Sequence, residues 1–316
     1  MSNQSVLVFP GQGAQTVGMG RDLAEAAPEI RELFTRADEL LGIPLTQIIF
    51  EGPESALVDT SVQQPALVLV SLAALKAVEL KAGHSLEPAA AAGLSLGEYA
   101  ALAAVGALSF GDALKLVRRR GELMKMASER TPGGMAVVLQ LDVDKIEAAC
   151  KQAAAETNAV VSICNFNGGG QIVMGGTLNA LDRAMALCKE AGARRCMKLP
   201  VAGAFHTALM QPAADGLKDV LASTEIRRAK APVYANYSAQ PVQEPTEIRA
   251  ALERQLTSPV RWEETVQNLV AQGLTHFLEL GAGKTVSNMI KKIAPDAQAR
   301  SVSTWAEASA EEEVSA

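Results

Sequence analysis

The first group in this sequence that could do chemistry is a serine between two glycines, in residues 93–97 (GLSLG). The alanine-rich run before it, residues 89–93, predicts a short strand, and the residues after it predict a helix. This pattern at a strand-to-helix turn is typical of a nucleophilic serine, because the sharp turn leaves little room for a Cβ at either glycine. The free N–H groups at the start of the helix would favour negative charge beside Ser95.

A serine nucleophile needs a base, and the chain has only three histidines. His84 lies in a polar segment, and His276 leads into a predicted strand. His206 lies in PVAGAFHTALM, between small residues and the start of an apolar helix, and is the best candidate for the base. No acidic residue stands out as the group that orients His206, and a backbone carbonyl could take that role.

A third candidate is an arginine on the apolar side of a helix predicted over residues 110–129. At about 100° per residue, Arg120 falls within roughly 60° of apolar residues on one stripe, whereas Arg118 and Arg119 point away from it. A buried guanidinium requires an anion. The partner is either an internal Glu or Asp, or a substrate carboxylate held by two hydrogen bonds.

The elements that position these residues follow an α/β pattern. A buried strand at 5–10 ends in a glycine turn, and helical spacing follows over 22–41 and 66–80. Residues 131–200 have the order β-α-β-β-α-β, which is the ferredoxin-like motif. We expect this segment to be an insertion. The larger domain would then be residues 1–130 plus 201–316, with a mostly parallel sheet.

Within the insertion, local patterns predict four strands and two helices. Asp142 and Thr177 are the expected N-caps of the helices. The strands are expected over 133–141, 159–167, 171–175 and 194–201, and the helices over 142–154 and 177–192.

Composition excludes several classes of protein. The formal net charge of −6 argues against nucleic acid as a partner. No apolar run reaches the ~18–20 residues of a membrane span, and the N-terminus lacks a signal-peptide pattern, so we expect a cytoplasmic protein. The four cysteines form no CxxC pair and predict reduced apolar thiols, with no metal site. The acidic tail, residues 306–316, predicts disorder.

Several stretches together resemble the malonyl-CoA:acyl carrier protein transacylases, an acyltransferase family of fatty acid and polyketide synthesis. The resemblance covers nearly the whole chain. The matching stretches are VFPGQGAQTVGMG, QQPAL, GLSLGEYAAL, LVRRRGELM, NFNGGGQIV, GAFHTALM, SPVRW and LELGAGKT.

This resemblance implies a hydrolase-like α/β domain with a ferredoxin-like subdomain. It further implies that Ser95 is acylated, with His206 as its base and Arg120 binding the malonyl carboxylate. The implied oxyanion hole consists of the backbone N–H groups of Gln12 and Leu96. Gln64 is implied as pocket lining. A backbone carbonyl near Gln255 is implied as the group that orients the histidine.

The sequence departs from the family at the residue before the serine, where Leu94 replaces the usual histidine. We expect only local packing or one hydrogen bond to differ. Phe205 resembles the malonyl-preferring version of its motif, and we hypothesise that its ring fills the space that a methyl-branched donor needs. Two glycine-rich stretches, GQGAQTVG and LELGAGKT, lack glycines that nucleotide-binding loops require, and we interpret them as tight turns.

The implied reaction moves a malonyl group from malonyl-CoA to the phosphopantetheine thiol of acyl carrier protein through a malonyl-serine ester, without a cofactor. We expect a monomer. Alternatives are a discrete acyltransferase serving a polyketide carrier, a serine thioesterase or hydrolase, and a non-catalytic carrier-binding scaffold. The candidate surface for docking an acidic carrier, or simply a solvated helix face, consists of Lys115, Arg118, Arg119, Lys125, Lys291 and Lys292.

Overall fold

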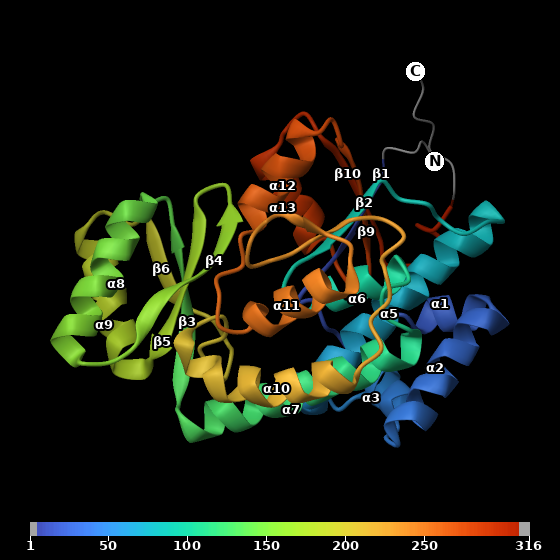
Figure 1. The fold of residues 1–316 in the computed structure, drawn as a ribbon, viewed down its shortest axis with the longest axis horizontal. Coiled ribbons are helices and arrows are strands. Elements are labelled where there is room, and N and C mark those ends of the chain that lie inside the picture. The colour runs from blue at the N-terminus through green and yellow to red at the C-terminus, as the bar shows by residue number, and fades with distance from the viewer. Residues whose placement is uncertain (1–4, 310–316) are drawn as a thin grey trace.

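A six-stranded sheet forms the centre of the computed structural model, which describes residues 5–309 (Figure 1). Its strand order is β10-β9-β1-β2-β7-β8, and every neighbouring pair is parallel except β7 with β8. The strands are β1 (Ser5–Phe9), β2 (Ala90–Gly93), β7 (Val233–Tyr234), β8 (Pro241–Val242), β9 (His276–Leu280) and β10 (Gln298–Val302). The strand predicted before the serine is therefore present, beside β1.

Helices cover both faces of this sheet. Alternate strand residues face opposite sides, so Val6 and Val8 pack with α12 and α13, while Leu7 and Phe9 join the larger apolar cluster of the other helices. The helices outside residues 131–200 are α1 (Arg21–Ala26), α2 (Pro28–Leu41), α3 (Leu45–Glu51), α4 (Glu54–Val58), α5 (Thr60–Ala82), α6 (Gly97–Ala104), α7 (Phe110–Arg130), η1 (Ala208–Met210), α10 (Gln211–Ser223), α11 (Pro245–Gln255), α12 (Trp262–Ala271) and α13 (Thr285–Ile293).

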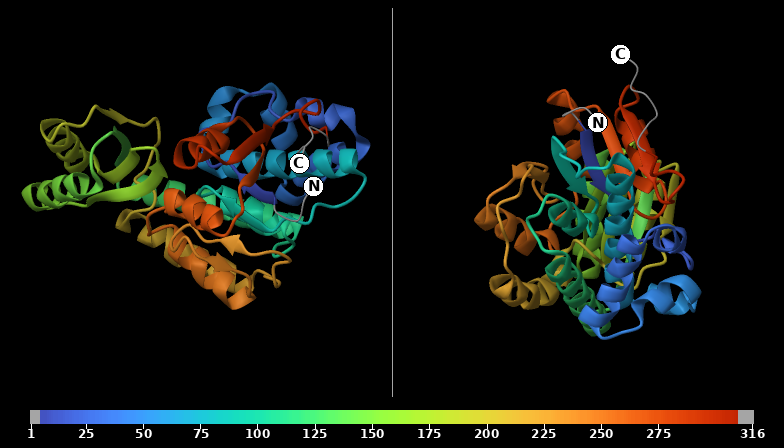
Figure 2. Two further views of the ribbon diagram at one scale, coloured as in Figure 1. Left: turned by 90° about the horizontal axis from the view of Figure 1, so that it is seen from above. Right: turned by 90° about the vertical axis from the view of Figure 1, so that its right-hand side faces the viewer.

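A second, smaller sheet is antiparallel and has the order β4-β5-β3-β6. This strand order and the β-α-β-β-α-β sequence of elements agree with the ferredoxin-like motif. Figures 1 and 2 show this sheet and its two helices beside the larger sheet. Its elements are β3 (Gly133–Leu139), α8 (Val143–Thr157), β4 (Val161–Gly168), β5 (Gln171–Thr177), α9 (Leu178–Glu190) and β6 (Arg195–Lys198). We propose that residues 131–200 are a subdomain inserted into the larger domain.

Three local expectations from the sequence need correction. The helix expected over residues 22–41 is two helices, because Ala27, which precedes Pro28, has an extended backbone. The helix expected from residue 66 begins at Thr60, where the Asp59 side chain caps it and Pro65 falls near its start. The caps expected at Asp142 and Thr177 lie at those positions but accept no capping hydrogen bond from the backbone.

The acidic tail is not wholly disordered. Ala308 is fully buried in the largest apolar cluster, and the Glu307 carboxylate accepts from the backbone N–H of Ser303 at 2.9 Å. The prediction of disorder is therefore wrong for residues 306–309. The rest of the acidic tail, residues 310–316, lies outside the described residues, as do residues 1–4 at the N-terminus.

Candidate active site

The serine corner connects β2 to α6 with a strained backbone. Ser95 has φ 53°, a left-handed conformation that costs a non-glycine residue about 1–3 kcal/mol. Asn236, in the loop after β7, holds this turn: its Oδ1 accepts from the Ser95 N–H at 2.6 Å, and its Nδ2 donates to the Gly93 carbonyl at 2.7 Å. A Cβ on Gly97 would lie 2.3 Å from the carbonyl oxygen of Phe9, which explains that glycine.

His206 lies within hydrogen-bonding distance of the serine. Its Nε2 is 2.7 Å from the Oγ of Ser95, and its Nδ1 is 2.9 Å from the backbone carbonyl oxygen of Gln255, the last residue of α11. A carbonyl oxygen can only accept, so Nδ1 carries the proton and Nε2 is free to accept from the serine hydroxyl. His84 and His276 lie elsewhere, after α5 and at the start of β9.

The environment of His206 favours the neutral imidazole. Burial, followed by the positive charge of Arg120, lowers the pKa of His206 to about 4, and hydrogen bonds to the backbone of Gln255 and Ser258 oppose this shift. The ring is therefore neutral and able to accept a proton throughout the neutral pH range.

Arg120 is fully buried in α7 and reaches the serine. Its Nη2 lies 3.1 Å from the Ser95 Oγ and 3.1 Å from the Gln255 Oε1, and its Nη1 donates to the Gln64 Oε1 at 2.8 Å. The guanidinium lies 5.3 Å from the centre of the Tyr99 ring. In the described part of the chain, no carboxylate forms an ion pair with Arg120, so its direct partners are neutral oxygens.

The glutamines predicted for the pocket are placed differently from one another. The side chain of Gln64 is fully buried and is fixed at both ends, by Arg120 and by the sulfur of Met124, which lies 3.3 Å from its Nε2. Gln12 follows β1, is half-buried, and donates its side-chain N–H to Gln63. Gln64 therefore contacts the reactive groups, whereas the side chain of Gln12 bonds to its neighbour on α5.

Two backbone N–H groups near the serine are free. Within residues 5–309, no oxygen accepts a hydrogen bond from the backbone N–H of Gln12 or of Leu96, the N-cap of α6. The ends of the two strands are tightly packed here, since a Cβ on Gly11 would lie 2.6 Å from the Leu94 carbonyl oxygen. These unpaired donors suit an oxygen that gains negative charge during a reaction.

The sequence interpretation missed two residues of this site. Glu98 is 1% exposed and accepts hydrogen bonds from the Gln255 side chain and from the Asn236 backbone. The sequence could have indicated Glu98, because a glutamate in the otherwise apolar helix GEYAALAA has to lie in the core or at the edge of the apolar surface. It could not have indicated Asn236, since an asparagine in a loop is ordinary.

Leu94 and Phe205, the two positions compared with the family pattern, are both packed. Leu94 is half-buried against the cluster on the α12 side of the sheet. Phe205 is 7% exposed, and a Cβ on Gly203 would lie 2.8 Å from its ring. Both placements are those of apolar packing residues next to catalytic candidates.

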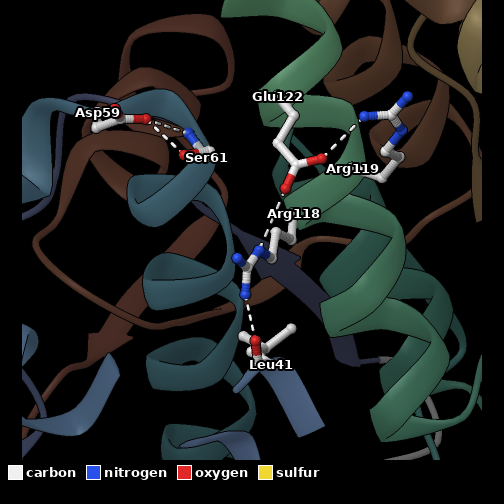
Figure 3. A network of polar contacts seen from close by, with 6 residues as sticks. All are labelled: Leu41, Asp59, Ser61, Arg118, Arg119 and Glu122. Carbon is white, nitrogen blue, oxygen red and sulfur yellow. Dashed lines mark hydrogen bonds and ion pairs between the residues drawn. The ribbon is translucent and has the colours of Figure 1, made fainter. Parts of the chain in front are cut away.

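Two arginines on the outer face of α7 already have partners (Figure 3). Arg119 is exposed and pairs with Glu122, whereas Arg118 is half-buried because its guanidinium bonds to the Leu41 carbonyl as well as Glu122. Lys125 pairs with Asp59 at 2.7 Å. Arg118 thus points away from the apolar stripe but is only partly exposed, and the docking surface for an acidic carrier stays a prediction.

The described residues contain no group of three or more histidine, cysteine or acidic side chains arranged to hold a metal ion. Over the same residues, no helix is long and apolar enough to cross a membrane. The four cysteines are buried free thiols, as the sequence indicates.

Residues 6–309 match the family model of the acyl transferase domain. The chain belongs to this acyl transferase family. It is 45% identical to the malonyl CoA-acyl carrier protein transacylase of Haemophilus influenzae, with 97% of each chain covered. It is 44% identical to the Bacillus subtilis protein of the same name, covering 90% of this chain and 89% of that one.

Solved structures of acyltransferases have the same fold. The acyl carrier protein S-malonyltransferase of Vibrio cholerae superposes with a TM-score of 0.91 at 41% identity, covering 96% of this chain and 98% of that chain. A malonyl-transacylase in complex with its type II PKS acyl-carrier protein has a TM-score of 0.92 at 40% identity, covering 96% and 97%. The present chain is therefore an acyltransferase with the α/β fold of these enzymes.

Proposed function

We propose that this acyltransferase moves a malonyl group from malonyl-CoA to the phosphopantetheine thiol of acyl carrier protein in fatty acid synthesis. The observation that carries this proposal is the buried Arg120, which forms no direct ion pair with any carboxylate of residues 5–309 and lies 3.1 Å from the Ser95 hydroxyl. A buried cation without an acid is costly unless a ligand supplies the anion. An acyl donor with a second, free carboxylate meets this need.

The first half of the reaction forms a malonyl-serine ester. His206 Nε2 takes the proton from the Ser95 Oγ as that oxygen attacks the thioester carbon. The free N–H groups of Gln12 and Leu96 donate to the carbonyl oxygen while it carries negative charge. The carbon–sulfur bond then breaks, and the imidazolium returns its proton to the departing CoA sulfur.

Arg120 couples carboxylate binding to the base. In the free enzyme its positive charge helps to hold the pKa of His206 at about 4. A malonyl carboxylate on Arg120 offsets that charge, so binding raises the pKa of His206 toward neutral pH, where a general base is more effective. An acetyl donor brings no carboxylate and lacks this effect.

In the second half, the carrier thiol takes the place of CoA. His206 accepts the thiol proton, the sulfur attacks the ester carbon, and the bond to the Ser95 Oγ breaks as that oxygen recovers its proton. The chemistry needs only the two substrates, and we propose that no cofactor takes part. A cytoplasmic location and a monomeric state remain predictions.

The alternative of a polyketide carrier uses the same residues. It is favoured by the similarity to the malonyl-transacylase solved with its type II PKS acyl-carrier protein. A thioesterase or simple hydrolase would resolve the same ester with water. Such an enzyme has no need for a buried cation beside its nucleophile, which argues against it.

A transfer assay tests the proposal. The protein is incubated with malonyl-CoA and holo acyl carrier protein of fatty acid synthesis, and the carrier mass and free malonate are both measured. We expect malonyl-carrier to form in large excess over malonate, and neither to form with Ser95→Ala. Free malonate as the main product would support the hydrolase alternative instead. Replacing the carrier by a polyketide-type carrier separates the two transferase functions.

A further inference from the structure

A buried carboxylate lies near the three reactive side chains but forms no hydrogen bond with any of them. Glu98, in the first turn of α6, is 1% exposed. Its Oε2 accepts from the Gln255 Nε2 at 2.8 Å and from the Asn236 backbone N–H at 3.1 Å. Removing a carboxylate from water is costly, and these two hydrogen bonds offset part of that cost.

The two residues that donate to Glu98, Asn236 and Gln255, also form hydrogen bonds with the backbone N–H and the backbone carbonyl of Ser95. The Asn236 side chain accepts from the Ser95 N–H at 2.6 Å, and the Gln255 Nε2 donates to the Ser95 carbonyl at 3.0 Å. Gln255 also accepts from Arg120 through its side-chain oxygen and from His206 through its backbone oxygen. One glutamine thus contacts the nucleophile, the base and the guanidinium.

The charge of Glu98 selects one orientation of the Gln255 amide. In the observed orientation the amide nitrogen faces Glu98 and the amide oxygen faces Arg120. Turning the amide by half a rotation would place its oxygen against the carboxylate and its NH2 group against the guanidinium. Both contacts would then lack a hydrogen bond, because a carboxylate only accepts and a guanidinium only donates.

We propose that ionised Glu98 is a positioning residue of this acyltransferase, which acts through Gln255 and Asn236 to hold Ser95, His206 and Arg120 in reactive geometry. The proposal rests on the proposed function, because its readout is malonylation of Ser95. When Glu98 is protonated, the amide of Gln255 loses its charge-selected orientation, and the guanidinium loses a fixed acceptor.

The proposal predicts a pH dependence, since burial raises the pKa of Glu98 to about 7, against the opposing effects of Gln255, Asn236 and Arg120. The titratable groups around it are Arg120 from α7, His206 from the segment before η1, and Tyr99 on its own helix. Strands β1 and β2 contribute no titratable side chain that faces it, and Tyr234 of β7 interacts with Gln272. Because the carboxylate is the active form, malonylation should become faster as pH rises through about 7.

The first test compares the wild type with Glu98→Gln, which keeps the size of the side chain but has no charge. The apparent second-order rate of Ser95 malonylation is measured by mass spectrometry from pH 5.5 to 9. The wild type should show the rise near pH 7. Glu98→Gln should lack this rise and be slower on the order of tenfold at pH 8. A Glu98→Gln profile with the wild-type rate and the wild-type rise would overturn the proposal.

Glu279→Gln is the matched control. Glu279 is also fully buried and accepts two backbone hydrogen bonds, from Val286 and Ser287 at the start of α13, but it lies on β9 and has no hydrogen bond to the reactive groups. It should lower the melting temperature and keep the rise near pH 7. Loss of the rise in this control as well would show a general effect of removing a buried charge, and would also overturn the proposal.

Gln255→Met provides a second route if Glu98→Gln does not fold. It keeps the backbone carbonyl that orients His206 but removes the N–H that stabilises the Glu98 carboxylate. Because Glu98 acts in part through this amide, the rise in rate should be lost or move to higher pH, and a wild-type rise at about pH 7 contradicts the proposal. If the wild type is not malonylated at any pH, the proposed function itself fails, which is a different outcome from either of these.

Discussion

The Nη2 atom of Arg120 lies 3.1 Å from the Oγ of Ser95, and among the described residues the guanidinium forms hydrogen bonds to neutral oxygens and no ion pair. This relationship places a cation next to the nucleophile with capacity left for an anion. A carboxylate that binds there also brings its own acyl carbon close to the serine, so donor selection and nucleophile positioning depend on the same side chain.

Replacing Arg120 by alanine should change donor preference. Losing the partner of a buried carboxylate costs about 3 kcal/mol, so malonylation of Ser95 should slow about 100-fold or more. Acetylation from acetyl-CoA, which needs no cation, should fall far less. Arg119→Ala is the control, because Arg119 is exposed on the same helix and should leave both rates unchanged. Equal losses with both donors in Arg120→Ala would contradict the role of Arg120 in carboxylate binding.

The ionisation of His206 can be observed directly by NMR of its ring nitrogens. Burial and Arg120 lower the pKa of His206 to about 4, so the ring should stay neutral, with its proton on Nδ1, as the pH falls to 5. The signals are assigned by comparison with His206→Gln, since the chain has only three histidines. A ring that becomes charged near pH 6.5, the ordinary histidine value, would be inconsistent with the buried geometry.

The same shift affects stability. In the unfolded chain His206 binds its proton near pH 6.5, whereas the folded protein binds it only near pH 4. The unfolded state therefore gains protons first as the pH falls, and the free energy of unfolding should decrease between pH 6.5 and 4. The decrease should be smaller in His206→Gln, as measured by urea denaturation at several pH values.

The serine corner should not accept a side chain at Gly97. A Cβ there would lie 2.3 Å from the Phe9 carbonyl oxygen, so Gly97→Ala should destabilise the protein by about 3 kcal/mol or more and reduce malonylation. Gly111→Ala is the matched control. Gly111 lies in α7, and a Cβ there would contact Leu40 of α2 at an ordinary 3.5 Å. The Gly111→Ala substitution should therefore be neutral or stabilise the protein by up to about 1 kcal/mol. Chemical denaturation measures both.

Phe205 should restrict the size of the donor. If its ring fills the space that a methyl branch needs, Phe205→Leu should raise the rate with methylmalonyl-CoA relative to malonyl-CoA about tenfold, since a methyl group in an apolar pocket is worth about 1–3 kcal/mol. Phe34→Leu makes the same change in a buried residue of α2 and should leave the ratio unaltered. A wild type that uses both donors at the same rate would end this hypothesis.

The sequence predicts the reactive side chains better than it predicts their supports. Ser95 and Arg120 have local signals, a glycine-bounded corner and an apolar helix stripe, and His206 follows from the scarcity of histidine. Asn236 shows no such signal, because its role depends on the placement of β7 beside β2, more than a hundred residues away in the chain. Only the folded sheet brings this amide to the serine.

Helices and strands are likewise predictable where local patterns decide them, and less so where tertiary contacts do. The β-α-β-β-α-β segment has alternating strand and helix patterns of ordinary length, and the structure has all six elements in that order. Composition predicts a solvated acidic tail, whereas Ala308 is buried in the largest apolar cluster and Glu307 accepts a hydrogen bond from the Ser303 backbone. The break before Pro28 was predictable, since a residue before proline avoids the helical conformation.

The most direct measurement of the central claim is the site and donor of acylation. The protein is mixed with malonyl-CoA or acetyl-CoA, quenched and digested, and the peptides are weighed and fragmented. The account predicts a malonyl adduct on Ser95 and little or no acetyl adduct under the same conditions. An adduct on another residue, or equal labelling of Ser95 by both donors, would contradict it.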